Sequence, residues 1–79
     1  MMDNERREYL EKAEKVYEKM VRDLQRRIRR LKRELKGIEG KSEFTRRCAL
    51  ENDIEYTKQK YSEALYDLQS IRRELMYDV

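Results

Sequence analysis

Hydrophobic residues recur along the chain in two runs, at alternating intervals of three and four positions. This spacing is typical of the a and d positions of a coiled-coil heptad, which bring a residue to the same helix face about every 3.5 positions. The first run is Leu10, Ala13, Tyr17, Met20, Leu24, Ile28, Leu31, Leu35 and Ile38, and the second is Leu50, Ile54, Thr57, Tyr61, Ala64, Leu68, Ile71 and Leu75. Two successive four-residue steps, at Met20, Leu24 and Ile28, predict a stutter where the supercoil locally unwinds.

Two glycines, Gly37 and Gly40, separate the two runs, and the chain contains no proline. Gly37 suits the left-handed residue that commonly follows the end of a helix. Ser42 suits the N-cap of a second helix, because its hydroxyl can accept a hydrogen bond from an unpaired backbone N–H. We therefore expect a loop over residues 37–42.

The two runs predict one helix over about residues 4–36 and another over about residues 43–77. Asp3 or Asn4 can cap the first helix through a side-chain oxygen. Both helices belong to a single predicted domain that covers residues 1–79.

A short link that contains glycine favours antiparallel packing of the helices on either side of it. Folding the chain at the predicted loop sets residue i opposite residue 79 − i, which brings Leu35 near Phe44 and Tyr17 near Tyr61. The predicted fold class is therefore all-α, a helical hairpin of two long antiparallel helices. One unbroken helix in a parallel coiled coil is the alternative, but two internal glycines would destabilise it by about 2 kcal/mol.

The hydrophobic face of the first helix is wider than the seam of a two-stranded hairpin. Val16, Val21 and Ile28 flank this seam, and Leu65 lies beside the seam of the second helix. A chain of this size with one seam is marginally stable, so we expect something to cover the additional surface. A second copy, giving a homodimeric four-helix bundle through these four residues, is the simplest cover, and a different protein is the next.

Composition excludes several classes of function. The chain has 79 residues, of which 47% are charged, with one Cys and no His. A single Cys cannot form a disulfide framework, and without His the usual zinc and haem ligands and the usual general base are missing. We therefore expect no cofactor, no metal and no enzymatic activity. No apolar run approaches the roughly 18 residues of a membrane span and no signal peptide is visible, so we expect a cytoplasmic protein without membrane contact.

The segment Gly40-Lys41-Ser42 precedes a predicted helix, as the end of a phosphate-binding loop does. That motif requires its first glycine at the position of Leu35, and it follows a strand of a parallel sheet. We interpret the segment as a turn and a helix cap.

Basic residues are concentrated in the middle of the chain. Residues 22–47 hold 11 basic and 4 acidic side chains, a net charge of +7, whereas residues 1–21 carry −1 and residues 48–79 carry −3. In a hairpin the middle of the chain is the loop end, so the sequence predicts a basic tip. Glu51, Asp53 and Glu55 are expected to face part of it, although they are too few to neutralise it. The candidate contact residues of this tip are Arg22, Arg26, Arg29, Arg30, Arg33, Lys36, Lys41 and Arg46.

Arginine predominates in the tip, and its planar guanidinium suits carboxylate or phosphate groups. We expect an adaptor or inhibitor that binds an acidic protein partner, a role common among small charged regulators of phages and mobile elements. A nucleic-acid-binding bundle is the alternative, although the basic run has few aromatic residues that could stack on bases. A structural coiled-coil spacer is the third possibility. The basic residues can also be a solvated face that contacts no partner. Tyr56 and Tyr66 lie off the seam and are candidates for a secondary contact, since Tyr is enriched at interfaces.

Overall fold

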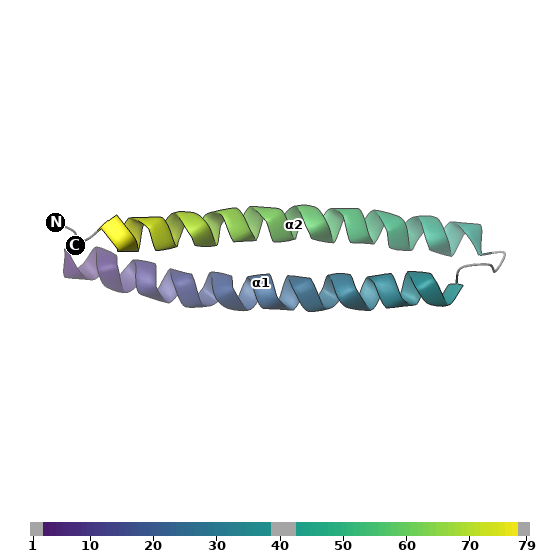
Figure 1. The fold of residues 1–79 in the computed structure, drawn as a ribbon, viewed down its shortest axis with the longest axis horizontal. Helices are drawn as coiled ribbons and strands as arrows, with labels where there is room; N and C mark the ends of the chain where they lie inside the picture. Colours follow the sequence, from purple (N-terminus) through teal and green to yellow (C-terminus); the bar gives the residue numbers. More distant parts are fainter. Residues whose placement is uncertain (1–2, 39–42, 78–79) are drawn as a thin grey trace.

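The computed structural model describes residues 3–38 and 43–77, which form two long helices packed side by side in opposite directions (Figure 1). Helix α1 spans Asn4–Ile38 and helix α2 spans Phe44–Tyr77. The rod that they form measures 60 × 15 × 14 Å. The predicted all-α hairpin is confirmed. Within the described ranges, both helices carry too many polar residues to provide a stretch suited to crossing a membrane.

Helix α1 begins at the residue that the sequence suggested as its cap. The Oδ1 atom of Asp3 accepts a hydrogen bond from the backbone N–H of Arg6 at 2.8 Å. The backbone carbonyl of Asp3 accepts another from the N–H of Arg7 at 3.1 Å. The first bond satisfies an amide that has no partner inside the helix, and the second is the first regular i→i−4 bond of the helix. Ser42, the predicted cap of α2, lies outside the described residues.

The end of α1 differs from the prediction. Gly37 lies inside the helix, so its assignment to a left-handed position after the helix is wrong. The additional helical residues bring Ile38 into the core, where it is only 5% exposed and clusters with Leu31, Leu50 and Ile54. Burial of Ile38 therefore explains why the helix continues through a residue with poor helix propensity.

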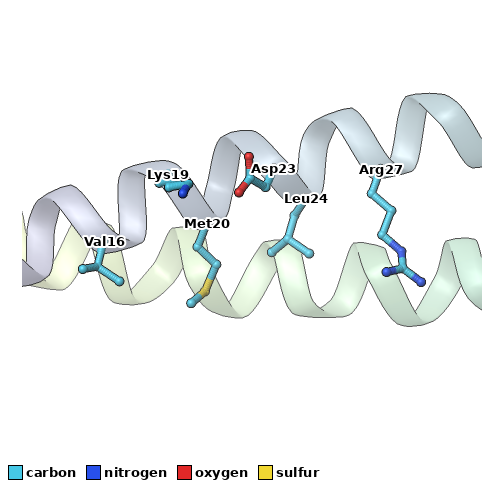
Figure 2. A pocket seen from close by; sticks show the side chains of 6 residues that line it. All are labelled: Val16, Lys19, Met20, Asp23, Leu24 and Arg27. Carbon is cyan, nitrogen blue, oxygen red and sulfur yellow. The ribbon is translucent and has the colours of Figure 1, made fainter.

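The contact face of α1 follows an unbroken heptad. Met20, which the sequence placed in the seam, is 42% exposed and lies on the flank of the helix beside Val16 (Figure 2). Val21 is half-buried in its place, and the predicted stutter is wrong for α1. A series of buried or half-buried positions instead alternates between steps of four and three through Leu10, Glu14, Tyr17, Val21, Leu24, Ile28, Leu31, Leu35 and Ile38. Ala13 and Glu18 are half-buried beside this series.

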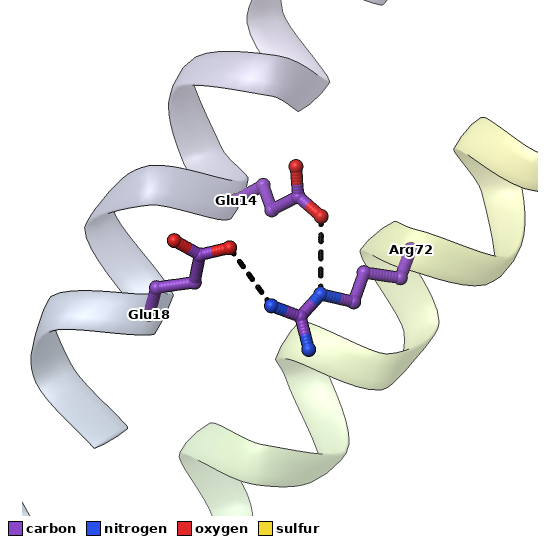
Figure 3. Close-up of polar contacts among 3 residues, drawn as sticks. All are labelled: Glu14, Glu18 and Arg72. Carbon is purple, nitrogen blue, oxygen red and sulfur yellow. Dashed lines mark hydrogen bonds and ion pairs between the residues drawn. The ribbon is translucent and has the colours of Figure 1, made fainter. Parts of the chain in front are cut away.

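Glu14 is the charged member of this seam, and Arg72 of α2 pairs with it (Figure 3). The Nε atom of Arg72 donates to Glu14 at 3.1 Å, and its Nη2 atom donates to Glu18 at 2.8 Å. The hydrogen bonds to Glu18 and then to Glu14 hold the pKa of Arg72 above its ordinary value. Because the two carboxylates have a partner on α2, the heptad can pass through a charged residue at this point.

The predicted seam of α2 is confirmed. Leu50, Ile54, Ala64 and Leu68 are buried, and the remaining positions are buried or half-buried. Thr57 is the one polar member of the buried set in the described chain, at 2% exposed. Its hydroxyl donates to the backbone carbonyl of Asp53 at 2.6 Å, which satisfies the hydroxyl within its own helix.

The register of the two helices is offset by one heptad from the prediction. Gln25 donates to the hydroxyl of Tyr61 at 3.1 Å, and Glu14 faces Arg72, so residue i lies opposite about residue 86 − i. The predicted relation, 79 − i, is wrong, and Phe44 is 78% exposed. Continuation of α1 through Ile38 moves the turn towards α2. A slip of seven residues leaves each a or d position facing another, so the hydrophobic match survives it.

We predict that Gly37→Ala stabilises the protein by about 0.5–1 kcal/mol, because glycine inside a helix is disfavoured relative to alanine. A Cβ atom at this position would meet no atom within 4 Å, so the methyl group fits without rearrangement. Urea unfolding followed by circular dichroism measures the change. A loss of stability would show that Gly37 adopts a left-handed conformation after all.

We predict that Arg72→Glu lowers the melting temperature, because it sets three carboxylates against one another at the open end of the hairpin. Adding Glu14→Arg and Glu18→Arg to this variant should restore much of the loss by reversing the pairs. Arg73→Glu is the matched control, since Arg73 is an exposed neighbour. A failure of the triple variant to recover would contradict the one-heptad offset described above.

Candidate binding surface

The predicted contact residues lie along the side of the rod rather than at its end. Arg22, Arg26, Arg29, Arg30, Arg33 and Lys36 are all exposed on α1. From Arg22 to Lys36 the helix advances by about 21 Å, which is a large part of the rod. Arg46 lies in the first turn of α2, and Lys41 lies outside the described residues. The basic tip is therefore a lateral surface on the loop-proximal half of α1.

Among the described residues, few carboxylates form ion pairs with these basic side chains. Arg26 approaches Asp23 at 3.9 Å and Arg46 approaches Glu43 at 3.8 Å, and all four side chains are at least 43% exposed. Exposed pairs of this kind contribute little to stability. Among the candidate contact residues that the structure describes, those that form no ion pair with a described residue are Arg22, Arg29, Arg30, Arg33 and Lys36.

The acidic residues of α2 do not neutralise the surface in the way that the sequence suggested. Among the described residues, Glu55 pairs with Lys58 of its own helix at 3.9 Å. The one-heptad offset moves Glu51 and Glu55 to the edge of a groove that they share with Lys32 and Leu35. The expected neutralisation of Arg22–Arg29 by this segment is therefore wrong.

Two shallow grooves adjoin this surface on α1. One, of about 390 Å³, is lined by Asp23, Arg26, Arg27, Arg30 and Arg33. Four guanidinium groups around one carboxylate favour an anionic ligand. The other groove, of about 410 Å³, is lined by Val16, Lys19, Met20, Asp23, Leu24 and Arg27 (Figure 2). The second groove adds an apolar strip beside the charge, because Val16 is 59% and Met20 is 42% exposed.

The four residues expected at a self-association face do not share one exposed face. Val21 and Ile28 are half-buried members of the seam of α1, and Leu65 is half-buried on α2. Val16 is exposed on the flank of α1, next to Met20. The apolar surface left uncovered on the first half of α1 consists of Tyr9, Val16 and Met20. The homodimer stays a prediction.

Tyr56 and Tyr66 are both exposed, at 62% and 70%, but they have different surroundings. The Nζ atom of Lys60 lies 5.5 Å from the centre of the Tyr56 ring, which is within cation–π range. Tyr66 lies beside Glu63 and Asp67 in a separate groove. The two rings therefore offer separate small contacts rather than one aromatic patch.

The basic surface lowers the stability of the helix that carries it. Arg22, Arg26 and Arg30 follow one another at intervals of four, and so do Arg29 and Arg33. Each like-charge pair at this spacing destabilises a helix by about 0.2–0.5 kcal/mol.

Comparisons of the chain with protein-family models, with curated proteins and with solved structures find no match. A function must therefore be inferred from the charge, exposure and geometry of α1. In the described parts of the chain, no group of three or more Cys, Asp or Glu side chains is arranged to hold a metal ion.

We predict that Arg29→Glu stabilises the isolated protein by about 0.5–1 kcal/mol, because the new carboxylate meets Arg26, Lys32 and Arg33 at helical spacings of three and four. Thermal unfolding at low salt measures the effect. Arg29→Gln is the control that separates the loss of repulsion from the gain of ion pairs. Added salt should reduce the difference between the variant and the parent. Destabilisation by the glutamate would mean that Arg29 has a structural role.

Proposed function

We propose that this chain is a non-catalytic binding protein that recognises an acidic protein surface through the outer face of α1. The observation that carries the proposal is the group of exposed basic residues on the loop-proximal half of this helix, where Arg22, Arg29, Arg30 and Arg33 lack an ion pair with any described residue. An acidic partner would supply the missing counter-charges and relieve the repulsion along the helix.

The residue types support a protein ligand. Arginine can bind a carboxylate through two parallel hydrogen bonds, which gives directional contacts as well as attraction. The rod is only about 15 Å thick, so one copy covers a narrow strip of a partner. This shape suits an adaptor or inhibitor that occludes a groove, and the grooves lined by described residues of α1 are shallow.

A cytoplasmic location forms part of the same proposal, and a homodimer is the alternative way to cover the apolar residues of α1. The single seam leaves Tyr9 70%, Val16 59% and Met20 42% exposed, and either the protein partner or a second copy packed into a four-helix bundle would cover them. The unpaired thiol of Cys48 is compatible with a reducing compartment. Sedimentation equilibrium of the purified chain tests the dimer directly.

Binding of nucleic acid is the second candidate, because the Arg-lined groove on α1 could also hold phosphate groups. The described part of this surface lacks the aromatic side chains on which single-stranded bases stack. Binding to the phosphate backbone of a duplex needs no such stacking, and it would show a steep dependence of affinity on salt concentration.

We predict that combining Arg29→Glu, Arg30→Glu and Arg33→Glu abolishes capture of the native partner while leaving helicity unchanged, since Glu and Arg have similar helix propensities. The matched control reverses Lys58, Lys60 and Arg73, which changes the net charge equally on α2. Affinity capture from the native host, quantified by mass spectrometry with and without nuclease, is the measurement.

A partner that survives nuclease and is lost only in the α1 variant supports the proposal. Loss with nuclease would instead assign the surface to nucleic acid. Equal capture by the α1 variant and the parent would show that the basic surface is merely solvated.

A further inference from the structure

Basic side chains occupy every b and f heptad position of α1 over seven successive steps. These are two of the three outer positions, and the third, c, holds Tyr9, Val16, Asp23 and Arg30. We call the row of b and f positions the basic ridge, and it consists of Lys12, Lys15, Lys19, Arg22, Arg26, Arg29, Arg33 and Lys36, all of them exposed. The ridge extends about 36 Å along the helix, well beyond the segment that composition had indicated.

Glu5 and Glu8 precede the ridge in the same row, whereas the later acidic residues of this half of α1 lie off it. Glu14 and Glu18 point to the side, where they hold Arg72 of α2 (Figure 3). Glu11 pairs with Arg7 one turn earlier at 3.2 Å. The first half of α1 is therefore nearly neutral in total, but its basic ridge begins at Lys12. Lys12, Lys15 and Lys19 extend the row of arginines towards the N-terminus.

The repeat of the ridge matches the repeat of another α-helix. Successive ridge residues are three or four positions apart, so they are spaced by about 5 Å on average along the axis of α1. A row of heptad positions on a second helix packed beside α1 has the same spacing. A duplex strand instead winds through a full turn within about 34–36 Å, so a straight ridge of this length meets it only in part. The geometry favours a helical protein segment over a nucleic-acid backbone.

An apolar strip lies along one edge of the ridge over its N-terminal part. Tyr9 and Val16 occupy the same heptad position one heptad apart, and Met20 lies next to Val16 (Figure 2). Lys19 of the ridge and these two apolar residues line the same groove. Charge alone would give weak, salt-screened attraction, whereas the apolar strip adds burial and fixes which way the partner faces.

We propose that the basic ridge and this strip dock an amphipathic acidic helix, with Asp or Glu in a heptad row beside a row of apolar residues. This inference rests on the proposed function and names its partner class. The helix lies along α1 on the side away from α2, forming a three-helix arrangement. A second copy fits less well, because the corresponding b and f row of α2, over Glu55, Gln59, Ser62, Tyr66, Gln69 and Arg73, carries only one carboxylate.

Two synthetic peptides of four heptads test the inference. The first carries Glu at two positions of every heptad in one row, with Leu in the adjoining row. The second has the same composition with the Glu residues distributed around the helix. We expect the row peptide to bind at least about tenfold more tightly by isothermal titration, because only its carboxylates align with the ridge.

The variant that combines Lys12→Gln, Lys15→Gln and Lys19→Gln should weaken binding of the row peptide by about tenfold, since it shortens the ridge by three contacts. Lys58→Gln, Lys60→Gln and Arg73→Gln together form the control and should leave binding unchanged. Circular dichroism checks that both variants stay helical, as expected for Gln on an exposed helix face.

Equal binding of the two peptides overturns the inference, because it would reveal attraction to any polyanion. Tighter binding of a 24-base-pair DNA duplex than of the row peptide overturns it in favour of nucleic acid. A dimer in sedimentation that dissociates in the Lys12, Lys15 and Lys19 variant overturns it in favour of a second copy. If reversal of Arg29, Arg30 and Arg33 abolishes capture of the native partner while this lysine variant captures it normally, the ridge fails and the proposed function stands.

Discussion

The structure depends on one hydrophobic seam between two helices. At the loop end this seam is a continuous cluster of Leu31, Ile38, Leu50 and Ile54, each no more than 7% exposed. Towards the open end it continues through Leu10 and Leu68, which are also buried, and through the charged Glu14. Ion pairs such as Arg6 with Glu74 join the helices at its edge. Exposed ion pairs contribute little, so the buried apolar residues supply most of the packing energy. With no third layer, the whole outer surface of both helices stays open to partners.

This arrangement separates stability from recognition on α1. Residues that face α2 hold the hairpin together, while those on the opposite side are free of packing constraints. The residues of the basic ridge are exposed on the side away from α2. They can therefore repel one another without disrupting the seam. Arg22, Arg29 and Arg33 lower the stability of an isolated helix slightly, and an anionic partner converts that repulsion into attraction. A deeper core would have buried part of this surface.

Much of the fold could be predicted from the spacing of apolar residues, but its register could not. A slip of seven residues preserves the facing of a and d positions, so only the length of the turn distinguishes the two registers. That length depended on whether Gly37 and Ile38 remain helical, and burial of Ile38 decided it. The seam of α1 was also misassigned at Met20, because a search for apolar residues passes over Glu14, whose place depends on Arg72 across the hairpin.

The same misassignment concealed the basic ridge. With Ala13 and Met20 in the seam, the outermost row would contain Glu18 between Lys15 and Arg22, and the row would look mixed. Composition revealed the cluster from Arg22 to Lys36 but carried no information on direction around the helix. Only the seam through Glu14 and Val21 aligns the lysines with the arginines.

The basic ridge and the buried seam share one period, and this couples the two along α1. A supercoiled pair keeps a row of period 3.5 on a fixed side, so the ridge does not drift around the rod. An insertion or deletion of one residue between Lys12 and Lys36 would rotate everything beyond it by about 100° relative to the preceding part. Evolution can therefore change the length of this hairpin only in whole heptads, and only by lengthening or shortening both helices together.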